Sequence, residues 1–298
     1  MTTASAPLAP KIAFLGTGSM GLIMAARLCE AGYALQVWNR TIEKAAVLAE
    51  QGASVHEQAS TAVATADIVI GMLENGAVVE DVLFGQDVAA AMKPGALFID
   101  MASIKPREAR DHAARLGALG IAHLDAPVSG GTGGATHGSL VIMVGGKAAE
   151  FDRALPLFRV FGRATHVGSH GAGQLTKLAN QMIVGITIGA VAEALLFATK
   201  GGADMAKVKE AITGGFADSR ILQVHGQRMV DRDFITHARL AIQLKDMRNA
   251  LATAQEIGFE APITALFEQL YADGAEHGLG DLDHSGLFVE LASRNGMN

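Results

Sequence analysis

Two polar residues near the middle of the chain have the types and the spacing needed for acid–base chemistry. Lys177 lies in an otherwise apolar segment, and Asn180 follows three residues later, on the same face if the segment is helical. A lysine in apolar surroundings has a lowered pKa, so it can give a proton to a carbonyl oxygen or take one from an alcohol. The alternative is a lysine whose ammonium reaches solvent from the start of a helix.

A glycine-rich segment, Asp125-Ala-Pro-Val-Ser-Gly-Gly131, directly follows an apolar run. Consecutive glycines leave backbone N–H groups free to form an anion-binding nest, and the hydroxyl of Ser129 adds a donor beside Gly130 and Gly131. The segment therefore predicts a site for a substrate carboxylate, with a plain structural turn as the alternative.

The N-terminal part of the chain has the Gly-x-Gly-x-x-Gly pattern of a dinucleotide site. Gly16, Gly18 and Gly21 follow a short apolar run and open a helical pattern. In this context they provide a tight turn, close approach of the backbone to a pyrophosphate, and close packing of helix on strand. The N–H groups of Ser19 and Met20, at the start of the helix, are then free to bind phosphate. A glycine turn without a ligand is the alternative.

The residues after the second expected strand favour NADP(H) over NAD(H). An NAD enzyme usually has Asp or Glu about 20 residues past the glycines, bound to the ribose 2′-hydroxyl. Here the position holds Asn39, followed by Arg40, Thr41 and Lys44. An amide beside two cations and a hydroxyl suits a 2′-phosphate, whereas the alternative is an ordinary solvated helix start.

The elements around these motifs change character along the chain. Short apolar runs that predict strands occur at 11–15, 34–38, 67–73, 96–100 and 122–126, with helical patterns between them. This alternation indicates parallel βαβ units, and hence an α/β fold with a doubly wound parallel sheet. After about residue 170 only helical patterns recur, and the longest, 173–199, is apolar nearly all round, as in a helix buried in a core or a subunit interface.

We therefore expect a disordered tail over 1–10, an NADP-binding Rossmann domain over 11–170, and an all-α substrate and dimerisation domain over 171–298. With 24 basic and 30 acidic residues, the net charge of −6 disfavours nucleic acid as a partner. One cysteine and ten histidines without ligand spacing predict no metal site. The longest uncharged apolar stretch, Met182–Ala192, is shorter than the roughly 20 residues of a membrane span. The first ten residues lack a secretory signal, so the expected location is the cytoplasm.

Four segments, in this order, resemble the β-hydroxyacid dehydrogenase family, which includes 3-hydroxyisobutyrate dehydrogenases, tartronate semialdehyde reductases and glyoxylate/succinic semialdehyde reductases. The segments are 14–21, 125–131, 171–180 and 244–246. The resemblance spans roughly Lys11 to Leu291, nearly the whole chain. It implies a Rossmann-type domain followed by a helical domain that supplies the dimer contact, as in proteins similar to 6-phosphogluconate dehydrogenase.

The resemblance also implies roles for individual residues. Lys177 would be the catalytic acid and base, Asn180 would orient it or the reacting oxygen, and Ser129, Gly130 and Gly131 would bind the substrate carboxylate. Lys245 and Asp246 would close the site near the nicotinamide, and Lys245 would also contact the cofactor. Further cofactor contacts would come from Met72, Leu73 and Ser103.

Two departures from the family pattern affect these roles. Many members have an asparagine four residues after the lysine, whereas here that position holds Gln181 and the asparagine is Asn180, so either amide can be the one that contacts substrate. Glu74 replaces a proline at the expected edge of the cofactor site.

The sequence thus predicts an oxidoreductase that interconverts a small 3-hydroxy acid and its semialdehyde with NADP(H), or less favourably NAD(H), as a homodimer or tetramer. One alternative is an imine or other carbonyl reductase on the same fold, although imine reductases generally lack the lysine. Another is a non-catalytic NADP-binding sensor, against which the presence of Lys177, Ser129 and the paired glycines argues.

Overall fold

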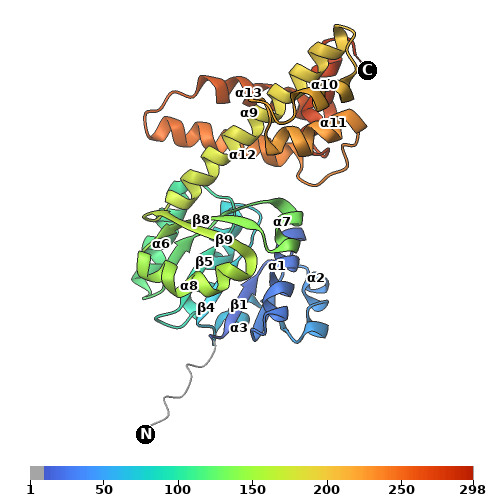
Figure 1. Cartoon of the computed structure of the whole chain (residues 1–298). Coiled ribbons are helices and arrows are strands. Elements are labelled where there is room, and N and C mark those ends of the chain that lie inside the picture. The colour runs from blue at the N-terminus through green and yellow to red at the C-terminus, as the bar shows by residue number, and fades with distance from the viewer. Residues whose placement is uncertain (1–9, 298) are drawn as a thin grey trace. The chain divides into compact units, whose positions relative to one another are not determined.

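The computed structural model describes residues 10–297 and divides into two compact units, Met1–Lys177 and Leu178–Asn298. The expected tail falls almost entirely outside the described residues. The first unit combines a sheet with helices, and the second is built from helices with an isolated β-bridge between Arg239 and Asp283 (Figure 1). The expected fold class is therefore confirmed.

The sheet of the first unit has nine strands in the order β3-β2-β1-β4-β5-β6-β8-β7, with β9 beside β8. Strands β1 to β6 pair in parallel, in the order 3-2-1-4-5-6 of a Rossmann fold. Strand β8 runs antiparallel to β6 and β7 and parallel to β9. The strands are β1 (Ile12–Leu15), β2 (Leu35–Trp38), β3 (Ser54–His56), β4 (Ile68–Gly71), β5 (Leu97–Asp100), β6 (Ala122–Asp125), β7 (Val128–Ser129), β8 (Leu140–Gly146) and β9 (Gly162–Gly168).

Both faces of this sheet are covered, which explains why its central strands are continuous apolar runs. Every residue of β1, β4 and β5 is buried, and alternate side chains belong to two separate core clusters. Phe14 packs with side chains of α1 and α8, whereas Leu15 packs with those of α3 and α6. The helices of this unit are α1 (Ser19–Glu30), α2 (Ile42–Ala46), α3 (Ala59–Val63), α4 (Gly76–Glu80), α5 (Val88–Ala91), α6 (Pro106–Ala118), α7 (Gly131–His137) and α8 (Ala148–Phe161).

The second unit has its own apolar core, formed by residues of α9, α12, α13 and α14, with Tyr271 and Phe288 fully buried. Helix α9 starts in the first unit and continues into the second. The helices are α9 (Ala172–Lys200), α10 (Met205–Ile212), α11 (Gln227–Asp231), α12 (Leu240–Glu256), α13 (Pro262–Gly274) and α14 (Leu287–Arg294). Short helical turns occur at η1 (Ala49–Gln51), η2 (Asp81–Gly85), η3 (Leu222–Gly226), η4 (Ala275–Leu279) and η5 (His284–Gly286).

Strands β3, β7, β8 and β9 and helix α7 were not expected from the sequence. Strand β7 has two residues and β3 has three, too few for a periodic pattern. Residues Gly131–His137 form helix α7, although three of its seven residues are glycines, which have low helix propensity. Gly130 and Gly131 still have positive φ angles, 134° and 61°, that favour glycine.

Helix α9 extends well beyond the uncharged stretch Met182–Ala192, because Glu193 ends that stretch but does not end the helix. By length and composition alone it could cross a membrane, with a mean hydropathy of 2.0 over its most apolar window. Within the described chain, 39% of that window is buried. A core helix of a soluble protein passes the same test, so the property is weak evidence for a membrane span.

Candidate functional site

The parallel strands of the first unit end in register, which brings the candidate segments to one edge of the sheet. Leu15 pairs with Trp38 on one side and with Gly71 on the other, Gly71 pairs with Asp100, and Asp100 pairs with Asp125. Ligands of such sheets bind beyond the carboxyl ends, where the strand order reverses, here between β1 and β4. The segments that follow these ends contain Gly16, Asn39, Met72, Ser103 and Ala126.

The glycine loop after β1 is packed as a dinucleotide-binding turn requires. Gly16 has φ +96°, and a Cβ there would lie 2.5 Å from the carbonyl oxygen of Met72 and 2.9 Å from the side chain of Leu73. A Cβ at Gly21 would overlap the carbonyl oxygen of Gly16. At Gly18 nothing lies within 4 Å of a Cβ position, so this glycine borders open space. The loop is therefore closed on the protein side and open on the other.

The start of α1 offers donors to a phosphate. Its N-cap, Gly18, provides no side-chain acceptor for the first N–H groups, which include those of Ser19 and Met20. The hydroxyl oxygen of Thr17 is buried and has no hydrogen-bond partner among the described residues. Free N–H groups, an unpaired hydroxyl and open space at Gly18 fit a dinucleotide diphosphate.

Asn39 ties the glycine loop to the end of β2. Its Oδ1 accepts a hydrogen bond from the Thr17 backbone N–H at 2.9 Å, and its Nδ2 donates to the Thr41 carbonyl oxygen at 2.9 Å. Arg40, Thr41 and Lys44 are exposed around the start of α2. The cations that the sequence assigned to a 2′-phosphate thus lie beside the glycine loop, while the amide of Asn39 holds the two segments together.

Lys177 is 9% exposed, and its Nζ donates a hydrogen bond to the Val128 carbonyl oxygen at 2.8 Å. Val128 belongs to β7 and directly precedes Ser129. Ser129 is half-buried, and Gly130 and Gly131 are exposed. The structure therefore brings the lysine that the sequence assigned to proton transfer next to the segment that it assigned to carboxylate binding.

Helix α9 contains Lys177, and its first turn is held in place by the buried carboxylate of Asp125. Asp125 Oδ1 accepts from the Gly171 N–H at 2.8 Å, and its Oδ2 accepts from the Gln174 N–H at 2.9 Å. Burial raises the pKa of Asp125, and these two hydrogen bonds oppose that shift. A Cβ at Gly173 would lie 2.5 Å from the Met143 carbonyl oxygen, so only glycine lets the helix start so close to the sheet.

Sequence reasoning missed Gln174, which is fully buried. Its Oε1 accepts from the Ile104 N–H at 3.1 Å, and its Nε2 donates to the Ala102 carbonyl oxygen at 2.8 Å. These two bonds bracket Ser103, which is half-buried. The signal was present in the sequence, because Gln174 is a polar residue one helical turn before Lys177 in an apolar pattern.

Asp100, at the end of β5, is a second buried acid at this edge. Burial raises its pKa to about 8, with further contributions from the nearby charges of Asp125 and Glu108. Its Oδ1 accepts from the Ala102 N–H at 3.0 Å, and its Oδ2 has no partner in the described part of the chain. Asp100 is therefore mostly protonated at neutral pH.

The remaining candidates form a polar cluster in the helical unit. Gln181, on α9, donates from Nε2 to Asp246 Oδ2 at 2.8 Å and to Gln243 Oε1 at 3.3 Å, both on α12. Asn180 Nδ2 donates to Gln181 Oε1 at 2.9 Å. Lys245 Nζ lies 3.2 Å from Asp246 Oδ1. Four sequence-assigned residues are thus linked in the order Asn180, Gln181, Asp246 and Lys245, and Gln243, which sequence reasoning did not select, contacts Gln181.

The structure also groups potential metal ligands that the sequence spacing did not suggest. Atoms of His225, Asp283 and His284 lie within 4.8 Å of one another. The guanidinium of Arg228 lies 2.9 Å from Asp283 Oδ1, and Ser285 Oγ donates to the same oxygen at 2.6 Å. Because Arg228 already neutralises the Asp283 carboxylate, we interpret the group as a structural ion pair.

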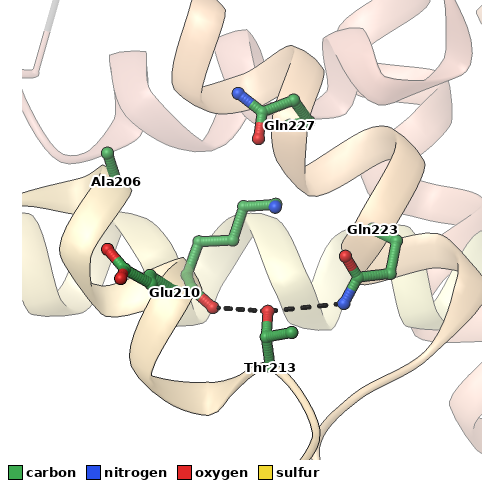
Figure 2. Close-up of a pocket in the computed structure, with 6 residues that line it drawn as sticks. Ala206, Glu210, Thr213, Gln223 and Gln227 are labelled. Atoms are coloured by element: carbon green, nitrogen blue, oxygen red, sulfur yellow. Dashed lines mark hydrogen bonds between the residues drawn. The ribbon is translucent and has the colours of Figure 1, made fainter.

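The helical unit also has a pocket of about 360 Å³, lined by residues of α10, η3 and α11 and by Thr213 (Figure 2). Thr213 Oγ1 donates to the Lys209 carbonyl oxygen at 2.9 Å and accepts from Gln223 Nε2 at 3.3 Å across it. Its lining contains no sequence-assigned site residue and consists of Ala206, Lys209, Glu210, Thr213, Gln223 and Gln227.

Comparisons with known proteins cover both units. Residues 11–171 match a family described as the NAD binding domain of 6-phosphogluconate dehydrogenase, and residues 171–291 match the NAD-binding domain of NADP-dependent 3-hydroxyisobutyrate dehydrogenase. The chain is 44% identical over 285 residues to 2-hydroxy-3-oxopropionate reductase of Escherichia coli, covering 94% of this chain and 97% of that protein.

Solved structures show the same relationship. A 3-hydroxyisobutyrate dehydrogenase of Mycobacterium tuberculosis, solved with L-serine, superposes with a TM-score of 0.88 at 34% identity, covering 95% of this chain and 99% of the other. An imine reductase from a Pseudomonas species covers 95% of this chain and 99% of its own, with a TM-score of 0.64 at 23% identity, a likeness of fold alone.

Proposed function

The chain belongs to the β-hydroxyacid dehydrogenase family, and from this premise we propose that it interconverts a small 3-hydroxy acid and the corresponding semialdehyde. Membership makes it an NAD(P)-dependent oxidoreductase that acts on a hydroxyl group. The 44% identity to a reductase of 2-hydroxy-3-oxopropionate, which is tartronate semialdehyde, makes that compound the first substrate to test.

One contact carries this proposal, the hydrogen bond from Lys177 Nζ to the Val128 carbonyl oxygen. It holds a buried amine beside the residues Ser129, Gly130 and Gly131, to which we assign the substrate carboxylate. A carboxylate bound there by a hydroxyl and backbone N–H groups leaves the rest of a three-carbon acid within reach of one lysine. We therefore expect the enzyme to prefer short acids.

The proposed proton transfers use this lysine in both directions. When bound, the nicotinamide cofactor supplies or accepts the hydride. Protonated Lys177 donates to the carbonyl oxygen during reduction, and neutral Lys177 removes the hydroxyl proton during oxidation. We assign Asn180, one turn further along α9, to orienting the reacting groups, and Lys245 and Asp246 to substrate binding.

We assign NADP(H) as the preferred cofactor on the residues after β2. Asn39 places no carboxylate where an NAD enzyme has one, and Arg40 and Lys44 provide two exposed cations next to the glycine loop. A 2′-phosphate would be stabilised by these cations, whereas a ribose hydroxyl would gain little from them.

We also assign the helical unit to self-association. Ile183 and Phe197 on α9 are 66% and 81% exposed, and Ile263 and Leu266 on α13 are each 60% exposed. A second copy of the chain could cover this apolar surface, giving a homodimer or a tetramer. The proposed location is the cytoplasm, in keeping with a single cysteine and an acidic surface.

The proposal is tested by following nicotinamide oxidation at 340 nm with tartronate semialdehyde, glyoxylate, succinic semialdehyde and methylmalonate semialdehyde. Lys177→Ala should lower turnover by about 10² to 10⁴, the usual contribution of a positioned acid or base, with little change in cofactor affinity. Lys207→Ala removes an exposed lysine from α10 and serves as the control. Near-normal turnover by Lys177→Ala would refute the assigned role, and tight NADPH binding without turnover of any acid would favour an imine substrate or a sensor.

A further inference from the structure

The polar cluster in the helical unit has a fixed hydrogen-bond direction that the family assignment does not supply. Gln243 and Asp246 on α12 are 1% and 2% exposed. Gln181 itself is half-buried, so at the Gln243 and Asp246 ends of these contacts the polar atoms are shielded from water and need protein partners. An amide has a donor end and an acceptor end, so its neighbours determine which way it lies.

Two acceptors on α12 set the orientation of Gln181. The Asp246 carboxylate can only accept, so the group 2.8 Å from it must be the Gln181 NH2. Gln243 also offers an oxygen to that NH2, because its own NH2 donates to the Gln181 backbone carbonyl at 3.0 Å. Both N–H bonds of the Gln181 amide are thus directed to α12, and its Oε1 lies on the other side.

The orientation of Gln181 fixes that of Asn180. Gln181 Oε1 accepts, so the Asn180 group 2.9 Å away must be the NH2. The Asn180 carbonyl oxygen is then directed away from Gln181. A carbonyl oxygen suits a hydroxyl or ammonium donor, and it would repel a substrate carboxylate.

We propose that Gln181 is a positioning residue, which holds Asn180 so that its carbonyl oxygen, rather than its NH2, is available to the reacting groups. The direction runs from the Asp246 carboxylate through Gln181 to Asn180. This inference rests on the proposed function, because it assumes a reaction at Lys177. In this proposal the Asn180 carbonyl oxygen accepts a hydrogen bond from a donor of the substrate, such as a hydroxyl beside the carbonyl. The substrate carboxylate is bound by Ser129, Gly130 and Gly131.

The substitution Gln181→Glu tests the direction without changing the volume of the side chain. A glutamate carboxylate cannot donate to Asp246, so kcat/KM near pH 8 should fall about ten- to hundredfold. The two acids would repel each other, which raises the pKa of one of them, and the Lys245 ammonium, 3.2 Å from Asp246 Oδ1, opposes part of that rise. At lower pH, where one of the two acids gains a proton, a hydrogen bond between the two side chains can form again, and the side chain at position 181 can still accept from Asn180. The kcat/KM of the variant should therefore recover relative to the parent enzyme.

The double variant Gln181→Glu/Asp246→Asn exchanges donor and acceptor between the same two positions and keeps their summed charge. The amide at position 246 would donate to the carboxylate at position 181, which would still accept from Asn180. We expect the double variant to recover at least about tenfold over Gln181→Glu near pH 8, a coupling that two independent structural defects would not give. Gln227→Glu is the matched control, because Gln227 donates to Asp231 at 2.9 Å on the surface of the same unit. It should leave kcat/KM and its pH profile unchanged.

Parent-like activity of Gln181→Glu at pH 8, or a loss that neither low pH nor Asp246→Asn relieves, would overturn the proposal. If the parent protein turns over no acid semialdehyde, the proposed function fails. The interaction between Gln181 and Asp246 is then measured by protein stability, without substrate. Thermal unfolding at pH 8 of the parent, Gln181→Glu, Asp246→Asn and the double variant should show a favourable coupling between positions 181 and 246, and additive losses would overturn the assigned direction.

Discussion

Replacing Gln174 by methionine should loosen the loop that contains Ser103, and the structure indicates by how much. Methionine has nearly the same length but cannot replace either hydrogen bond. The Ile104 N–H and the Ala102 carbonyl would be left unpaired where both residues are 1% exposed. Each such group costs about 1–3 kcal/mol. Burying the methionine returns about 1.5–3 kcal/mol, so the net loss is about 2 kcal/mol.

A loss of about 2 kcal/mol lowers the midpoint of thermal unfolding by about 4–8 °C in a unit of this size. The loop around Ser103 would also need to be ordered on binding, so the NADPH Kd should rise about tenfold, equivalent to about 1.4 kcal/mol. Thermal unfolding with and without NADPH, and a fluorescence titration of NADPH, measure the two effects.

The control for this substitution is Gln86→Met. Gln86 is exposed and donates to Asp81 at 2.7 Å, so its loss should change stability by no more than about 0.5 kcal/mol. If Gln174→Met unfolds within 2 °C of the parent, or binds NADPH equally well, then the amide does not hold the loop in the way we describe.

Three further predictions follow from the charges and the exposed surfaces. Arg40→Ala should weaken NADPH binding at least about tenfold and leave NADH nearly unchanged, because only NADPH has the 2′-phosphate; equal losses in titrations of both would contradict the assignment. Asp100→Asn should raise the unfolding midpoint at pH 8 and have little effect at pH 4. The unfolded chain releases this proton near the ordinary pKa of 3.8 and the folded chain only at about 8, so stability falls as the pH rises between these values; equal shifts at both pH values would show that charge is not the cause. Phe197→Glu with Leu266→Glu should shift the chain to a smaller species in light scattering, and an unchanged mass would remove this surface from the assembly.

Much of the fold could be predicted from the sequence because its strongest signals are periodic and local. The apolar runs of β1, β4 and β5 are buried on both faces, so every position reads as apolar. Helix α9 was expected over 173–199 and extends one residue beyond each end. Short or polar elements gave no such signal, and β3, β7 and β9 were missed for that reason, whereas β8 was missed although its residues Leu140–Val144 form an apolar run.

The site was harder to predict where its parts meet through side chains from distant positions. The glycine loop and Lys177 have types and spacings that indicate their chemistry. By contrast, the bonds of Gln174 to the loop after β5 join residues 70 and 72 positions apart, so the apolar pattern around Gln174 marks it as unusual but does not identify its partners. Gln243 was missed similarly, because a glutamine on a helix usually reads as a surface residue.

The bridging role of Asn39 has a consequence for how the coenzyme preference could evolve or be engineered. Asn39→Asp would introduce the carboxylate typical of NAD enzymes and could still accept from the Thr17 N–H. It would lose the donor that binds the Thr41 carbonyl oxygen and place a charge beside it. The Asn39 side chain therefore affects both the selectivity between NADPH and NADH and the anchoring of the glycine loop. A route to NADH that begins at Arg40 would keep both hydrogen bonds of Asn39, whereas an exchange at position 39 would lose one of them, and no side chain at position 41 could restore it because the acceptor is a backbone carbonyl.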